Sequence, residues 1–181
     1  MIDSDKAVLA VALPHASRLA ALYATATFAD AYAVKLPSHA TTDPEQLARF
    51  ILLNQAPWVA WLMKVRDAMV AGFGLKTAHQ LQPSEGSRND RRVHIFKIYD
   101  TLADEILLGE DDRHLDFRMS ILRQQTNAEG GGADLTLTTV VMCHNRLGRA
   151  YIKLIAPFHR AIVRDCLRRA ARTGWPAASK P

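Results

Sequence analysis

The feature that most constrains the fold is the stretch at residues 140–169, where a strand pattern gives way to a long amphipathic helix. From Leu147 onward apolar residues recur every three or four positions, which is the period of one helical face. These residues are Leu147, Tyr151, Leu154, Ile155, Phe158, Ile162, Cys166 and Leu167. Pro157 lies inside this helix and removes a backbone donor, so a kink is expected. Gly174 and Pro176 predict the helix end, and residues 173–181 form a tail that is expected to be frayed from residue 176.

The first third of the chain predicts a short helical turn, a strand and a helix pair. Residues 17–24 form the turn, and residues 26–35 alternate as a strand does. Asp43 is a cap residue directly before Pro44, and this order predicts the start of a helix. Helical spacing continues to about residue 71, but Pro57 interrupts it, so two helices are expected rather than one. Residues 81–92 are polar and predict a loop.

The middle of the chain changes from helical spacing to strand alternation. Strands are predicted at residues 93–99, 105–110, 114–123 and 135–143, with a glycine-rich hairpin loop at 126–134. The strand at 114–123 places apolar and polar residues on opposite faces. An antiparallel sheet with one apolar face needs a cover, and the C-terminal helix provides it. The sequence therefore predicts an α+β, helix-grip fold: a curved antiparallel sheet wrapped around a long C-terminal helix, with a helix pair after the first strand.

Length and charge narrow the functional classes. A chain of 181 residues predicts a single domain, with its core at about 17–172. The segment from residue 146 to residue 172 contains eight Lys and Arg residues and only one acidic residue, Asp165. The net charge of the whole chain is +5. Because no aromatic residues interleave with these charges, we expect no nucleic acid partner, and a solvated helix face or a protein contact instead.

The hydropathy of the sequence predicts no membrane-spanning helix and favours a cytoplasmic protein. No apolar run approaches the roughly 18 residues of a transmembrane helix. The apolar run at residues 7–13 is short and follows two aspartates, unlike a signal peptide. Cys143 and Cys166 lie in apolar patterns and are interpreted as small core residues.

Two polar clusters are candidates for chemistry. His114 and Asp112, near the start of a strand, are candidates for an acid–base pair, although pairing across the sheet is the favoured interpretation of this cluster. His144, with Asn145 and Arg146, lies where a strand meets the long helix and could bind a polar head group, although capping by Asn145 is the simpler interpretation. His159 is interpreted as structural. The histidine spacing predicts no metal site, and no cofactor fingerprint is present.

Five segments in order resemble a known family: residues 28–32, 57–77, 111–118, 138–149 and 157–159. They resemble the bacterial family catalogued as domain of unknown function 2867, over about residues 17–170. The resemblance implies a helix-grip fold similar to the START and polyketide-cyclase (SRPBCC) superfamily, whose members commonly hold apolar ligands between the sheet and the long helix. It implies no activity. Some relatives carry a nucleotide-binding oxidoreductase domain, so an oxidoreductase-type partner protein is a further implication.

The leading functional hypothesis is a module that binds an apolar small molecule or lipid between sheet and helix. The candidate ligand-binding residues are Phe117, Met119, Val141, His144, Tyr151, Ile155 and Phe158. One alternative is an enzyme of the cyclase or isomerase type that uses His114 or His144 as acid or base. Another is a module that docks on a protein or membrane through the basic helix face.

Overall fold

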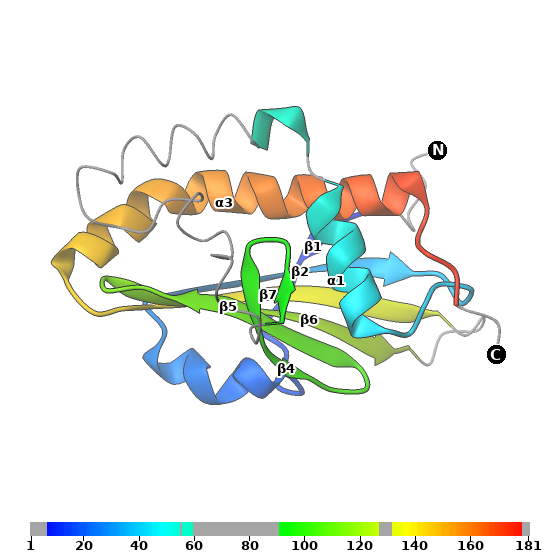
Figure 1. The fold of residues 1–181 in the computed structure, drawn as a ribbon, viewed down its shortest axis with the longest axis horizontal. Helices are drawn as coiled ribbons and strands as arrows, with labels where there is room; N and C mark the ends of the chain where they lie inside the picture. The colour runs from blue at the N-terminus through cyan, green and yellow to red at the C-terminus, as the bar shows by residue number, and fades with distance from the viewer. Residues whose placement is uncertain (1–6, 55, 60–90, 127–131, 179–181) are drawn as a thin grey trace.

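A computed structural model describes residues 7–54, 56–59, 91–126 and 132–178. Within these residues the protein is α+β, with a seven-stranded antiparallel sheet in the order β1-β2-β7-β6-β5-β4-β3 and a long C-terminal helix (Figure 1). This confirms the expected class and the helix-grip-like arrangement. The strands are β1 (Leu9–Ala10), β2 (Phe28–Leu36), β3 (Arg92–Val93), β4 (Phe96–Thr101), β5 (Glu105–Asp111), β6 (Leu115–Gln125) and β7 (Ala133–Cys143). The helices are the 3-10 helix η2 (Arg18–Thr25), α1 (Pro44–Leu53) and α3 (Arg146–Thr173).

Both faces of the sheet are covered. The helices α1 and α3 lie on one face, and η2 lies on the other (Figure 1). The α3-facing layer holds the main core, which includes Leu137 and Ile121 from the sheet and Leu167 from the helix. The sequence placed Ser120 on a polar strand face, and the structure shows that this face is buried too, because η2 packs there.

A buried carboxylate joins η2 to the sheet. Glu105 is 2% exposed and accepts hydrogen bonds from the Ser17 hydroxyl at 2.6 Å, the Arg18 backbone N–H at 3.0 Å and the Ser120 hydroxyl. Ser17 is also the N-cap of η2. A charged acceptor with several donors offsets its desolvation, so this cluster has a structural role.

The predicted long helix is confirmed as α3. Asn145 is its N-cap and accepts from the Gly148 backbone N–H at 3.0 Å, as expected. Pro157 lies inside the helix, and Figure 1 shows that the helix axis changes direction in its N-terminal half. The predicted inward stripe is wrong in this half. The buried residues there are Gly148, Ile152 and Ala156, whereas Leu154 is 57% exposed.

Two further predictions need correction. The strand predicted at 93–99 is a hairpin, because the chain reverses at His94, whose φ is 55°, and β3 pairs with β4. The C-terminal tail is not frayed at residues 175–178. Trp175 is buried beside Phe50, and the Pro176 carbonyl accepts from the Thr41 backbone N–H at 2.7 Å.

Other predictions hold or lie outside the described residues. Asp43 caps α1 and Pro44 is its first residue, as expected. The second helix of the predicted pair falls almost entirely within residues 60–90, outside the described residues, as do most of the predicted loop at 81–92 and the centre of the hairpin loop at 126–134. The basic residues of α3 lie on its exposed side.

Candidate functional site

Three polar side chains, one buried and two half-buried, interrupt the apolar layer between the sheet and α3. Asp30 lies on β2, and alternation along that strand turns it to the same face as Phe28 and Tyr32. Thr139 pairs with Asp30 directly across β2 and β7, so the two side chains share this face. His159 comes from α3, three positions after the inward-facing Ala156, on the side of the helix that meets β2.

The side chains of this cluster are close together and lack hydrogen bonds of good geometry. Asp30 is 11% exposed, and its Oδ1 lies 3.4 Å from the Nε2 of His159. Its Oδ2 lies 3.6 Å from the Nε of Arg160. Among the described residues, both carboxylate oxygens, the Thr139 hydroxyl and the Nε2 of His159 are buried without a hydrogen-bond partner. Buried polar atoms normally have partners, so such a group needs a specific explanation.

Phe28 and Arg160 pack against one side of this cluster. The Phe28 ring packs edge-on against the His159 ring, with centroids 5.7 Å apart, and the Arg160 guanidinium lies 5.3 Å from the centre of the Phe28 ring. β1 pairs with Tyr32 and Ala33 of β2, and directly after β1 the Val11 backbone N–H donates to the Ala31 carbonyl at 3.0 Å. Within the described residues, no strand therefore flanks Phe28 to Asp30 on their outer side, and the cluster lies at an open edge of the sheet.

Three predicted ligand-binding residues share the α3-facing side of the sheet with Asp30. Phe117 pairs with Val141, which pairs with Phe28, and Met119 pairs with Thr139. Val141 and Met119 are buried, and Phe117 is half-buried against Phe96. The sheet thus presents two adjacent rows to the helix: an apolar row, and a row that contains Asp30 and Thr139.

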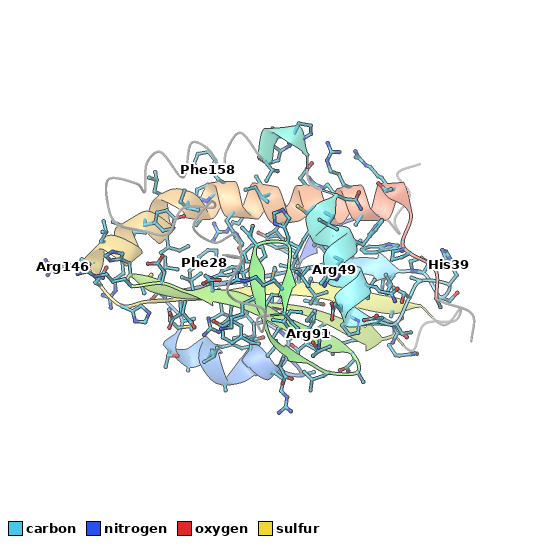
Figure 2. The ribbon with its side chains drawn as sticks, in the orientation of Figure 1. Phe28, His39, Arg49, Arg91, Arg146 and Phe158 are labelled. Carbon is cyan, nitrogen blue, oxygen red and sulfur yellow. The ribbon has the colours of Figure 1, made fainter. Side chains whose placement is uncertain are left out.

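The predicted helix residues lie on one side of α3, next to the side that the structure buries at Ile152 and Ala156. Tyr151 and Ile155 are half-buried. Phe158 is 46% exposed and lies on the side of α3 away from the sheet, whereas Phe28 lies between sheet and helix (Figure 2). The expected position of Phe158 between sheet and helix is therefore wrong.

The candidate His144 lies on the opposite side of the sheet from α3. Its Nε2 is 3.1 Å from Oδ1 of Asp116. Asp116 and Ser120 are four positions apart on β6, so they lie on the same face of the strand, which is the face that contacts η2. The expected position of His144 in the layer between sheet and helix is therefore wrong.

His114 and Asp112 form the turn between β5 and β6. His114 is 8% exposed, and its Nδ1 lies 2.9 Å from the Asn145 side-chain nitrogen. The oxygen of that amide caps α3, so its nitrogen is the atom that faces His114. Nδ1 of His114 is therefore an acceptor, and its proton is on Nε2. Asp112 Oδ1 is 3.4 Å from the His114 backbone N–H, which is a turn contact.

Comparison with known protein families assigns the chain to one of them. The family described as "Protein of unknown function (DUF2867)" matches residues 22–166, which contain Asp30, Thr139 and His159. The chain belongs to this family. No curated protein matches the sequence.

Two features of the sequence indicate this cluster. Asp30 is an acid at an inward position of a strand, and His159 follows Pro157 on the helix. His159 was interpreted as structural, and Asp30 was not singled out.

The described part of the chain contains no group of three or more His, Cys, Asp or Glu side chains suited to a metal ion. None of the helices within the described ranges is long and apolar enough to cross a membrane.

Proposed function

We propose that this protein binds an apolar small molecule or lipid between its sheet and the N-terminal half of α3. The observation that carries the proposal is the group of buried polar atoms of Asp30, Thr139 and His159, which lack hydrogen bonds inside an otherwise apolar layer. Ligand sites of this type combine an apolar lining with a few placed polar groups. The ligand's polar group would supply the missing hydrogen bonds.

The apolar part of the ligand would lie along Phe117, Met119 and Val141. Phe117 and Val141 form the row next to Asp30 and Thr139, and Met119 continues the row of Asp30 and Thr139, so one molecule could contact both rows. On the helix, the small side chain of Ala156 faces this layer. The resemblance to START-like proteins supports the same location for the ligand.

The test begins with native mass spectrometry of the purified protein and chemical identification of any molecule that it carries. Binding of N-phenyl-1-naphthylamine, a neutral apolar dye that fluoresces in apolar sites, is measured in parallel. Ala156→Phe should fill the layer and reduce dye binding. Ala161→Phe, on the exposed side of the same helix, should leave it unchanged. A bare protein mass together with no dye binding would contradict the proposal.

An enzyme that uses His144 has less support. Its pairing with Asp116 resembles an acid–base pair, but the two residues lie on the opposite side of the sheet from the proposed ligand. If an activity is found, replacing His144 should not abolish it, whereas replacing Asp30 or His159 should.

A further inference from the structure

We propose that Asp30 and Thr139 recognise a hydroxyl group, so that the ligand is a neutral apolar alcohol or phenol. This inference rests on the proposed function and adds the chemical class of the ligand. Nothing in the family description assigns a ligand or a site.

The hydrogen-bonding capacity of the cluster matches a hydroxyl group. Both oxygens of Asp30 are buried acceptors without a hydrogen bond of good geometry, and their contacts with His159 and Arg160 are long, at 3.4 and 3.6 Å. The hydroxyl of Thr139 is also without a partner, and it can both donate and accept. A ligand hydroxyl would donate its proton to Asp30 and accept the proton of Thr139. An ether or ester can only accept, so it would leave the carboxylate without a donor.

The charges around Asp30 favour a neutral ligand group. A ligand carboxylate or phosphate would lie beside the buried carboxylate of Asp30 and would be repelled. A ligand ammonium would be attracted by Asp30, but Arg160 already lies 3.6 Å from it. Arg164, one turn further along α3, lies over the Tyr32 ring on the same strand at 5.1 Å. These two guanidinium groups oppose a second cation, so a neutral donor fits best.

The position of the cluster offers a path for such a ligand. Asp30 is at the part of β2 that no described strand flanks, and Phe28 and Arg160 lie over it. Arg160 is 49% exposed, so it can move without disturbing the core. The hydroxyl would remain near this edge, and the apolar part would extend inward along Val141 and Phe117.

The experiment compares four ligands of similar size as competitors of N-phenyl-1-naphthylamine: 1-decanol, 1-methoxynonane, decylamine and decanoic acid. 1-Methoxynonane is the matched control because it has the same number of heavy atoms as 1-decanol but no hydroxyl donor. We expect 1-decanol to displace the dye at about tenfold lower concentration than 1-methoxynonane, the ratio expected for one buried hydrogen bond. The amine and the acid should displace it less well than the alcohol.

Variants then locate the selectivity. Asp30→Leu should remove the preference for the alcohol over the ether, and Thr139→Val should reduce it while keeping the side-chain shape. Thr138→Val is the matched control, because Thr138 is the next residue on β7, is also buried and lies on the η2 face. This variant should keep the full preference.

The outcomes separate the two proposals. A bare protein mass together with no dye binding by the wild-type protein would overturn both the proposed function and this inference. Dye binding with equal displacement by alcohol and ether would overturn this inference alone. A preference that survives in Thr139→Val, or that Thr138→Val removes, would also overturn it, and these tests do not depend on the folding of Asp30→Leu.

Discussion

The backbone carbonyl of His114 occupies the space where a side chain on Gly148 would begin. The first turn of α3 therefore contacts the β5–β6 turn directly, and the Cys143 Cβ lies 3.5 Å from the same position. This contact sets where the helix begins its path across the sheet.

Gly148→Ala should destabilise the protein, although alanine favours helices more than glycine does. The added Cβ meets backbone atoms, which cannot rotate away, and overpacking of this kind costs about 1–3 kcal/mol. Urea unfolding measures the change. Gly132→Ala is the control, because its nearest neighbour would be the Leu36 carbonyl at an ordinary 3.5 Å. A Gly148→Ala protein as stable as the wild type would contradict the contact.

Asn145→Ala should lower the free energy of unfolding by about 1 kcal/mol, the usual effect of losing an N-cap. Asn145→Asp keeps the cap oxygen but replaces the donor that faces Nδ1 of His114 with an acceptor. The proton of His114 should then move from Nε2 to Nδ1. Nitrogen NMR of the imidazole distinguishes these tautomers. An Nδ1 proton already present in the wild type would show that the amide is oriented the other way.

Glu105→Ala should destabilise the protein by about 3 kcal/mol or more, because it leaves Ser17, Ser120 and the Arg18 backbone N–H without their shared acceptor. Glu105→Gln should have a smaller effect. Asp104→Ala, at the exposed neighbouring position, is the control. Thermal and urea unfolding should rank the three variants in that order, and a small effect of Glu105→Ala would mean that η2 is not held by this cluster.

Cys166 should be unreactive in the folded protein. Burial raises the pKa of its thiol to about 11, with Asp165 contributing in the same direction. Very little thiolate is therefore present at pH 8, and the thiolate is the reactive form. In a Cys143→Ser background, Ellman's reagent should react only as urea unfolds the protein. Because the folded pKa is above the ordinary value, this group's stabilisation is present below about pH 9 and is lost as pH rises through 11. Rapid reaction under native conditions would contradict this burial.

Deleting residues 175–181 should destabilise the protein, because Trp175 packs on Phe50 and residues 176–178 bond to the segment before α1. Trp175→Ala alone should cost about 3 kcal/mol, and Trp175→Phe should cost less. Urea unfolding followed by circular dichroism avoids relying on the tryptophan signal. Unchanged stability after the deletion would mean that the tail is frayed, as the sequence alone suggested.

The elements with local signals could be predicted from the sequence. Asp43 before Pro44 and Asn145 before α3 are side chains that bond to the backbone only a few residues away, so neighbouring residues suffice to identify them. Alternation in β6 and β7 was likewise sufficient to assign their faces. The hairpin at His94 had no such signal, because neither glycine nor asparagine marks the turn.

The predictions that were wrong concern side-chain positions that depend on packing between distant parts of the chain. The expected stripe on α3 followed the large apolar residues, but the residues that are buried in this half of the helix include the small Gly148 and Ala156. The candidate site has a different difficulty. Asp30 and His159 come from opposite ends of the chain, and only the pairing of β2 with β7 and the path of α3 bring them together.

The pairing of β2 with β7 also has a consequence during synthesis. β2 bonds to β7 along its whole length, and the Thr27 hydroxyl accepts from the Cys143 backbone N–H, 116 residues later. The first long strand therefore leaves the ribosome well before its partner exists. Closing such long loops is slow. Until β7 emerges, β2 lacks the strand with which it pairs along its whole length, so its inward side chains are exposed for most of synthesis.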